Sequence, residues 1–375
     1  MALSAAFSFS LIASLLVALV IVATQRLHGH FTHDHHPGVQ KLHAVPTPRI
    51  GGVALFFGAV VGGINLPAEA QWLWWMICLA ALPAFVFGLT EDLTKQVSVK
   101  MRLIATICSG LIFSILTDYQ IRETDLPGVD WALSFWLVSF LFTAFAMGGS
   151  ANAINIIDGV NGLASGTSII IMGGFALVAW QMGDAQILGI CLVSMGSLTG
   201  FFLLNFPSGR IFLGDAGAYV IGFILAAVAV ALPLRNPALS PLIGLLALSY
   251  PVTETMVSIH RRMKREGTHP GQPDRLHLHS LIYRSRARRL AAKLGAPHLR
   301  NATAGFVMLS LPLLSSGLMV IFGKHTSGIW ASLAVVVLAY LLVYRKVALL
   351  KRREPRPLHT RPQTSTGKAR PKGLV

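Results

Sequence analysis

Acidic residues are scarce in this chain of 375 residues, which contains 15 Asp and Glu against 31 Lys and Arg. Charged residues make up only 12% of the sequence, whereas hydrophobic residues make up 54%. A soluble domain of this length is not so apolar throughout, which excludes an ordinary soluble protein. Apolar runs of roughly 17–25 residues are what helices need to cross the ~30 Å hydrocarbon core of a bilayer. The scarcity of charge therefore indicates a membrane protein.

Cysteine is also rare. The three cysteines, Cys78, Cys108 and Cys191, all lie within apolar runs. Their spacing allows neither a disulfide framework nor a Cys-x-x-Cys metal site. We therefore expect all three to be packing residues.

About eleven apolar runs have the length of a membrane span, which predicts an all-α, polytopic membrane protein. The runs cover residues 5–24, 51–66, 72–90, 101–117, 131–150, 163–182, 185–206, 216–234, 238–259, 302–322 and 328–344. The first run lacks the basic segment and the cleavage site of a signal peptide, so we expect a permanent helix. Residues 1–344 are predicted to form one integral membrane domain. Residues 345–375 are predicted to form a basic, disordered tail near anionic lipid headgroups.

The basic residues are distributed unequally between the two sides of the predicted membrane domain. When the connections are assigned alternately to two sides, all Lys and Arg except Arg122, Arg235 and Lys324 fall on one side. Because basic residues accumulate in cytoplasmic loops, this side is predicted to be cytoplasmic, with the N-terminus outside and the C-terminus in the cytoplasm. The formal net charge of +16 is thus explained by topology, and we do not expect nucleic-acid binding.

Four connections bring carboxylates and imidazoles to the predicted cytoplasmic face. They contain the stretches "FGLTEDLTK", "NAINIIDGVNGLASG", "GRIFLGDAGAYVIGF" and "HPGQPDRLHLHSL". Read singly, each has a structural explanation as a helix end, a turn or an N-cap. Ionisable groups at a membrane edge are costly, however, and four such stretches on one face indicate a functional site.

Clustered oxygen ligands suit Mg²⁺ or Mn²⁺, which commonly share their coordination with substrate phosphates. A divalent ion neutralises the charge that develops during phosphoryl transfer. Arg275, His277 and His279 could hold further phosphate oxygens. The residues therefore predict metal-dependent phosphate chemistry with one lipid substrate and one cytosolic substrate.

The motifs resemble those of the polyprenyl-phosphate N-acetylhexosamine-1-phosphate transferases of glycosyltransferase family 4. "KLHAVPTPRIGG" is similar to an early cytoplasmic motif of that family, and "EDLTK" stands where its paired aspartates are found. "NAINIIDGVNGLASG", "FLGDAGA" and "PDRLHLHSL" resemble three further motifs in the same order. The number of predicted spans favours the GlcNAc-1-phosphate transferase branch.

The resemblance implies that a polyprenyl phosphate attacks the β-phosphate of a UDP-amino sugar and that UMP leaves. Asp215 would bind Mg²⁺ or Mn²⁺, and Asn155 and Asp158 would be further ligands or contact the water bound to the metal, with Asp158 also catalytic. Asp92 or Glu91 would orient or deprotonate the lipid phosphate, although Glu91 replaces the first of the family's paired aspartates. The implied substrate contacts are Lys41, His43, Arg49, Asn152, Asp274, Arg275, His277 and His279. Asn161 stands where many members have Asp.

The implied enzyme would begin synthesis of a cell-envelope polysaccharide, such as O-antigen, in the bacterial cytoplasmic (inner) membrane, with its site facing the cytoplasm. An apolar groove between helices would take the polyprenyl chain. A homodimer is left open.

Phospho-MurNAc-pentapeptide transferase is the alternative within the family, and a lipid phosphatase or a multi-pass transporter is the alternative outside it. Acids within the spans, such as Glu254, would be expected of a transporter. The His-rich segment 28–36 is predicted to be an interfacial loop, with loose Zn²⁺ or Ni²⁺ binding as the alternative.

Overall fold

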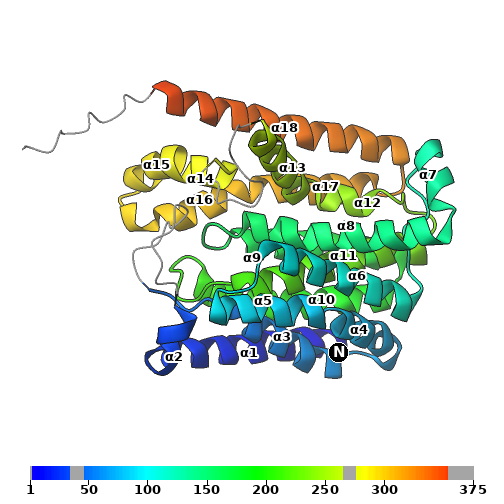
Figure 1. Cartoon of the computed structure of the whole chain (residues 1–375), viewed down its shortest axis with the longest axis horizontal. Coiled ribbons are helices and arrows are strands. Elements are labelled where there is room, and N and C mark those ends of the chain that lie inside the picture. The colour runs from blue at the N-terminus through cyan, green and yellow to red at the C-terminus, as the bar shows by residue number, and fades with distance from the viewer. Residues whose placement is uncertain (1, 34–45, 265–275, 354–375) are drawn as a thin grey trace, which may run out of the picture.

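The computed structural model describes residues 2–33, 46–264 and 276–353, and these residues form helices and connections without a β-strand. In hydrocarbon every backbone N–H and C=O must be paired within its own segment, which a helix achieves. The all-α prediction is confirmed (Figure 1). The helices are α1(Ala2–Ala23), α2(Gln25–Thr32), α3(Gly51–Ile64), α4(Ala68–Ala80), α5(Leu82–Thr94), α6(Val99–Thr117), α7(Pro127–Leu133), α8(Trp136–Ile157), α9(Leu163–Met182), α10(Ala185–Asn205), α11(Gly214–Arg235), α12(Ile243–Ala247), α13(Ser249–Met263), α14(Leu278–Ile282), the π-helical turn η1(Tyr283–Ala287), α15(Arg288–Lys293), the 3₁₀ turn η2(Pro297–Leu299), α16(Arg300–Met308), α17(Ser310–Phe322) and α18(Thr326–Arg353).

All eleven predicted apolar runs lie largely within helices. Within the described ranges, eight helices are long and apolar enough to cross a membrane, and α4 with α5, bent by 43°, makes up to nine. The run 51–66 forms the shorter α3, and the run 238–259 is divided between α12 and α13. A polytopic membrane protein is therefore confirmed, while the count of eleven crossings and the orientation stay predictions.

The last helix is longer than the sequence pattern indicates. The basic tail is predicted to begin at residue 345, but α18 continues through Arg353. Val347 is buried against the core, so the apolar face of the helix extends beyond the predicted boundary. Residues 354–375 of the tail lie outside the described part of the chain.

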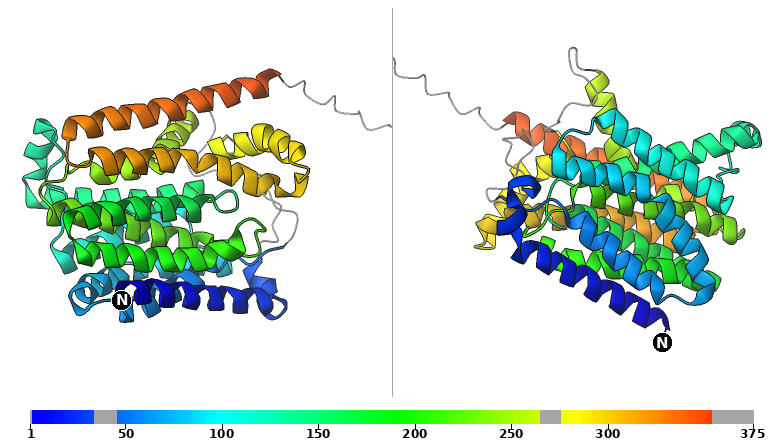
Figure 2. Two further views of the ribbon diagram at one scale, coloured as in Figure 1. Left: turned by 180° about the vertical axis from the view of Figure 1, so that it is seen from behind. Right: turned by 60° about the horizontal axis from the view of Figure 1, so that its bottom comes forward.

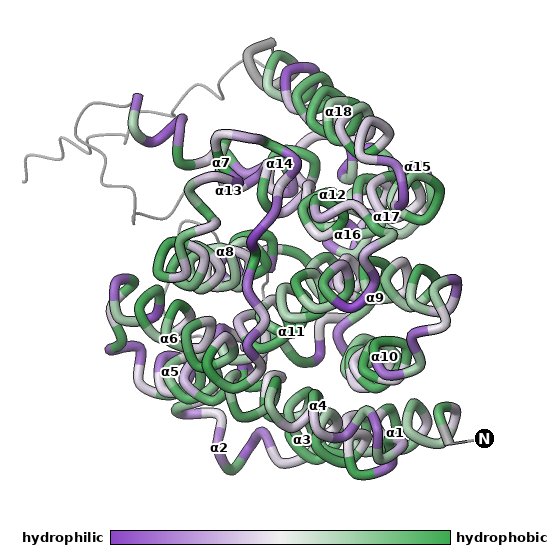
Figure 3. The backbone as a smooth tube through the Cα atoms, turned by 90° about the vertical axis from the view of Figure 1, so that its right-hand side faces the viewer, coloured by the Kyte–Doolittle hydropathy of each residue, from purple (hydrophilic) through white to green (hydrophobic). Residues whose placement is uncertain are grey.

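The long helices run roughly alongside one another, and α11 lies in the middle of the bundle (Figures 2 and 3). It packs against α3, α5, α8 and α9. Nearly all its residues are buried, as expected of a helix that is apolar on every side. The position of α11 therefore determines how the surrounding helices meet.

Small residues allow the beginning of α11 to lie very close to two neighbours. A Cβ atom at Gly52 would overlap the backbone of Gly217, and one at Gly88 would lie 2.7 Å from the Cα of Ala216. Close helix contacts through small residues are typical of membrane bundles. They fix α3 and α5 against the end of α11 from which Asp215 projects.

The opposite end of α11 is held by a buried ion pair. Arg235 donates to both carboxylate oxygens of Asp184, with Nε 2.8 Å from Oδ2 and Nη2 3.1 Å from Oδ1. Asp184 also accepts a hydrogen bond from the backbone N–H of Ile187 and so caps α10. This pair lies at the end of the bundle away from the predicted cytoplasmic loops and joins α10 to α11.

We expect Gly52→Ala to destabilise the protein, because the added methyl group would force α3 away from α11 at a cost of about 1–3 kcal/mol. Gly317→Ala is the matched control, since nothing lies within 4 Å of the added atom. Thermal unfolding in detergent should give a lower Tm for the first variant only. Equal Tm values for the two variants would show that α3 and α11 are not in tight contact at Gly52.

Candidate active site

Asp92 binds the N-terminus of α11. Its Oδ1 accepts a hydrogen bond from the backbone N–H of Asp215 at 2.9 Å, and its Oδ2 accepts one from Ala216 at 3.0 Å. The first N–H groups of a helix have no partner within the helix and attract negative charge. Asp92 is completely buried. This carboxylate therefore fixes the point from which the Asp215 side chain projects.

Glycine is required immediately before Asp215. Gly214 has φ +73°, a conformation that residues with a side chain adopt rarely. A Cβ atom here would also overlap the carbonyl oxygen of Arg49 and crowd the Asp92 carboxylate. The backbone conformation and its close neighbours therefore require the glycine of the "FLGDAGA" motif.

Two motifs that are far apart in the sequence are joined by backbone hydrogen bonds. Phe212 donates to the carbonyl oxygen of Pro48 at 2.8 Å, and Gly51 and Gly52 donate to Phe212 and Leu213 at 3.0 and 2.9 Å. This pairing brings Arg49 to the carboxylates, with its Nη2 3.6 Å from Asp215 Oδ1. The same nitrogen lies 3.9 Å from Asp92 Oδ1.

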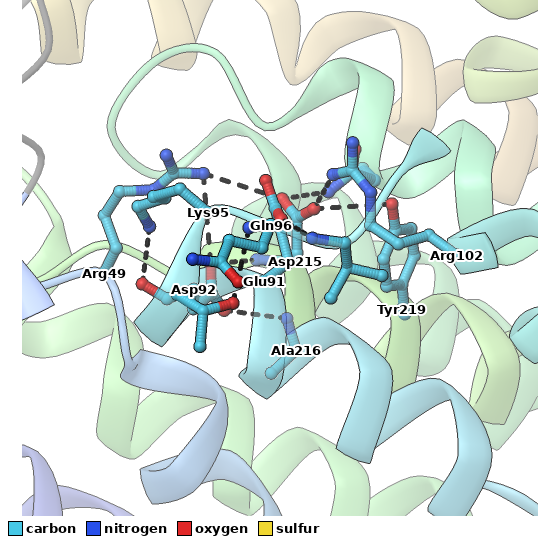
Figure 4. A network of polar contacts seen from close by, with 12 residues as sticks. Arg49, Glu91, Asp92, Lys95, Gln96, Arg102, Asp215, Ala216 and Tyr219 are labelled. Atoms are coloured by element: carbon cyan, nitrogen blue, oxygen red, sulfur yellow. Dashed lines mark hydrogen bonds and ion pairs between the residues drawn. The ribbon is translucent and has the colours of Figure 1, made fainter. Parts of the chain in front are cut away.

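Arg102 is a site residue that sequence reasoning missed. It projects from the first turn of α6, and its Nη1 forms a hydrogen-bonded ion pair with Asp215 Oδ2. Figure 4 shows Arg49 and Arg102 on opposite sides of the two aspartates. The available signal was a pair of basic residues, Lys100 and Arg102, at the beginning of an otherwise apolar helix, because charged residues are costly in a membrane.

The "NAINIIDG" stretch contributes from the end of α8. Asn155 Nδ2 donates to Asp215 Oδ1 at 3.1 Å. Asp158 directly follows the helix, and no hydrogen bond or ion pair to its carboxylate occurs within the described ranges. Burial raises the pKa of the Asp158 carboxyl to about 7, with Arg49 opposing and Asp215 adding to the increase. Asp158 is therefore the carboxylate of this group that is not already paired.

Other polar residues of these motifs have structural partners. Asn152 donates to Thr106 Oγ1 at 2.9 Å and to the carbonyl oxygen of Gly148. Glu91 Oε2 accepts the backbone N–H of Val97 at 2.9 Å and closes the turn after α5. The substrate contact predicted for Asn152 and the catalytic role predicted for Glu91 stay predictions.

The turn after Asp158 is held by asparagines from three segments. The backbone N–H of Asn161 donates to Asn301 Oδ1 at 2.6 Å, and its side-chain Nδ2 donates to the carbonyl oxygen of Pro207 at 3.0 Å. Gly162, with φ +75°, donates to Asn205 Oδ1 at 2.7 Å. In the described arrangement Asn161 thus fixes the turn by donating hydrogen bonds.

The histidine motif reaches the same turn. His279 is buried against Gly159, where a Cβ atom would overlap its ring, and it therefore lies beside the residue that follows Asp158. His277 is also buried and precedes α14. Four further predicted contacts, Lys41, His43, Asp274 and Arg275, lie outside the described residues. The predicted loop at 28–36 is wrong for residues 28–32, which belong to α2, where His28 bonds to Thr32 Oγ1 at 2.8 Å and to the carbonyl oxygen of Ile21 at 3.1 Å.

The donor set fits Mg²⁺ better than a metal that needs a cage of protein ligands. In the part of the chain that the structure describes, no three Asp, Glu, His or Cys residues gather closely enough to surround an ion. Mg²⁺ is commonly bound by one or two carboxylates and completed by water and substrate phosphates. Asp215, with Asn155 beside it and the unpaired Asp158 nearby, could provide such a set.

A family model described as glycosyl transferase family 4 matches residues 74–233, which include Asp92, Arg102, Asn155, Asp158 and Asp215. This part of the chain is therefore similar to that family. An undecaprenyl-phosphate α-N-acetylglucosaminyl 1-phosphate transferase of Yersinia pestis is 25% identical over 313 residues, covering 82% of this chain and 81% of the relative. A probable undecaprenyl-phosphate N-acetylglucosaminyl 1-phosphate transferase of Bacillus subtilis is 28% identical, covering 72% and 75%. A phospho-N-acetylmuramoyl-pentapeptide-transferase of Geobacillus thermodenitrificans is 28% identical, covering 49% and 60%.

We expect Arg102→Met to lower the Tm strongly. Removing one member of a buried ion pair costs about 3–5 kcal/mol. Asp215 would keep only Arg49, 3.6 Å away, as a cationic partner. Arg122→Met is the matched control, because Arg122 is 56% exposed and lies 3.9 Å from an exposed Asp118. Its Tm should change little, since exposed pairs contribute about 0–1 kcal/mol.

A double variant tests whether Arg102 acts through Asp215. Adding Asp215→Asn to Arg102→Met removes the carboxylate that has lost its main partner, so part of the lost Tm should return. A total decrease in the double variant equal to the sum of the two single decreases would mean that the two side chains do not interact.

Proposed function

We propose that this protein transfers a sugar-1-phosphate, with GlcNAc-1-phosphate as the first candidate, from a UDP-N-acetylhexosamine to undecaprenyl or another polyprenyl phosphate. A phosphate oxygen of the lipid forms a bond to the β-phosphorus of the donor. The bond between that phosphorus and the bridging oxygen breaks, and UMP leaves with the oxygen. The observation that carries the proposal is the convergence of Asp92, Asp215, Arg49 and Arg102 at one end of a membrane bundle whose relatives are named for this transfer.

Asp215 and Asp158 would hold Mg²⁺, with Asn155 beside them, and the ion would supply charge neutralisation at the transferred phosphoryl group. Arg49 and Arg102 can bind phosphate oxygens directly, because a guanidinium has five N–H donors. The Nε of Arg102 is buried and has no partner among the described residues. The pair of arginines thus offers donors beyond those that the aspartates accept.

Asp92 is suited to positioning rather than to proton removal. Both of its oxygens already accept backbone N–H groups. A phosphate monoester loses its second proton with a pKa of about 6, so the lipid phosphate is largely dianionic at neutral pH. The acceptor therefore needs to be aligned with the donor more than it needs a general base.

An apolar groove of about 470 Å³ offers a place for the polyprenyl chain. It lies between α8, α11 and α12, and its lining includes Phe142, Ala146, Ser150, Ala229 and Leu245. Ser150 precedes Asn155 by five residues on α8, which corresponds to about 7.5 Å along the helix axis. A lipid whose chain lies in the groove could therefore bring its phosphate to the carboxylates. We propose that this happens from within the bacterial cytoplasmic membrane, with the site on the cytoplasmic side.

The test is UMP release by the purified protein with undecaprenyl phosphate and Mg²⁺. We expect release from UDP-N-acetylglucosamine and its loss when EDTA removes the metal. UDP-N-acetylgalactosamine and UDP-MurNAc-pentapeptide, offered separately, identify the donor. Hydrolysis of the lipid phosphate without a UDP-sugar would favour a phosphatase, and no UMP from any donor would contradict the proposal.

Asp215→Asn should lower kcat by about a thousandfold, because it weakens both the metal site and the pairing with the two arginines. Asp184→Asn is the matched control at the other end of the bundle. Asn can still cap α10 and accept from Arg235, so the UMP release of the folded protein should be unchanged. Comparable losses in both variants would point to a folding defect rather than to a role in the site.

Filling the groove tests the proposed path of the lipid. Ala146→Phe should raise the KM for undecaprenyl phosphate by about tenfold, because the added ring occupies volume that the chain would use. The KM for the UDP-sugar should stay within about twofold. Leu177→Phe, at an exposed position of α9 outside the groove, controls for added aromatic bulk. An unchanged KM for undecaprenyl phosphate in Ala146→Phe would show that the polyprenyl chain does not lie in this groove.

A further inference from the structure

Glu254 is a completely buried acid on α13, and every described hydrogen bond to it comes from outside that helix. Its Oε1 lies 3.0 Å from His277 Nδ1, and its Oε2 accepts the hydroxyl of Tyr340, on α18, at 2.9 Å. The backbone N–H of Leu278 donates to both oxygens, at 3.2 and 3.3 Å. A buried carboxylate is stable only with such partners, so the acid and the histidine segment hold one another in place.

The contact with Glu254 determines the tautomer of His277. An ionised carboxylate only accepts hydrogen bonds, so Nδ1 of His277 must carry the proton that it donates. A neutral His277 then has its lone pair on Nε2. The His277 side chain is only 7% exposed, which leaves the ring little freedom to take another orientation.

His277 in turn supports His279. The two rings are stacked, with centroids 5.4 Å apart and planes 5° from parallel. His279 is 4% exposed and lies against Gly159, and its Nδ1 has no hydrogen-bond partner within the described residues. A continuous series of contacts therefore leads from Glu254 through His277 and His279 to the turn that carries Asp158.

We propose that Glu254 is a positioning residue that, through His277, holds His279 in place to bind the UDP-sugar donor. This inference rests on the proposed function. Glu254 touches none of the site residues at Asp215, so it is not a catalytic residue. Burial lowers the pKa of His279 to about 4, and Glu254 offsets this effect only in part. His279 is thus neutral at neutral pH and offers the donor a hydrogen bond rather than a charge.

The experiment compares the KM for the UDP-sugar with the KM for undecaprenyl phosphate in Glu254 variants of the full chain. Glu254→Leu removes all the hydrogen bonds, and we expect the donor KM to rise about tenfold or more while the lipid KM changes less than about twofold. Glu254→Gln keeps an acceptor for His277 and should restore the donor KM to within about threefold of the wild type. If Glu254→Leu does not fold, Glu254→Asp, which shortens the side chain by one methylene, is expected to raise the donor KM by about threefold.

Tyr340→Phe is the matched control, because it removes a hydrogen bond from the same carboxylate without touching His277. It should lower the Tm but leave the donor KM within about twofold. A donor KM that rises in proportion to the lost Tm in all variants, Tyr340→Phe included, would make Glu254 merely structural. An unchanged donor KM in Glu254→Leu or Glu254→Asp would also overturn the proposal.

A double-variant cycle with His279→Ala tests the route. If Glu254 acts through His279, Glu254→Leu should raise the donor KM no further when His279 is already Ala. Additive increases would mean that Glu254 acts elsewhere. These KM comparisons require that the wild-type protein releases UMP. A wild-type protein that releases no UMP would refute the proposed function itself.

Discussion

The carboxylate of Asp92 on the N-terminus of α11 is the contact on which the rest of the site depends. The first N–H groups of a helix have no partner within the helix, and where this end of α11 is buried a partner must come from the protein. Asp92 supplies it from α5. The backbone bonds between the Pro48–Gly52 segment and the Phe212–Leu213 segment then fix α3 against the same point. Three helices are thereby joined where the Asp215 side chain emerges.

Charge compensation follows from this arrangement. Asp92 and Asp215 would repel one another without nearby cations, and Arg49 and Arg102 provide them from two different elements. The same guanidinium groups are suited to phosphate oxygens. Stability and phosphate binding therefore use the same side chains, and Asp158 remains the carboxylate without a described partner.

The sequence predicts the helices and their apolar runs well, because hydropathy over a window of about twenty residues reports directly on the bilayer. It also indicates that Asp92, Asn155 and Asp215 converge, since helix ends on one face must lie near one another. It does not predict that Asp92 caps α11 or that Arg102 pairs with Asp215. Such contacts depend on how each helix is rotated about its axis, and charge and hydropathy along α6 do not specify that rotation. The partners of Glu254 were hidden for a similar reason, because they come from segments more than twenty residues away.

The turn that follows Asp158 has a consequence for how a substrate is received. Asn161 and Gly162 are tied to Asn301 and to the segment that contains Asn205 and Pro207, which are two other stretches of the chain. Ordering this turn therefore costs conformational entropy when the protein folds rather than when a substrate arrives. The loop behind the site is preorganised, so binding free energy can be used for aligning the reacting phosphates instead of immobilising the protein.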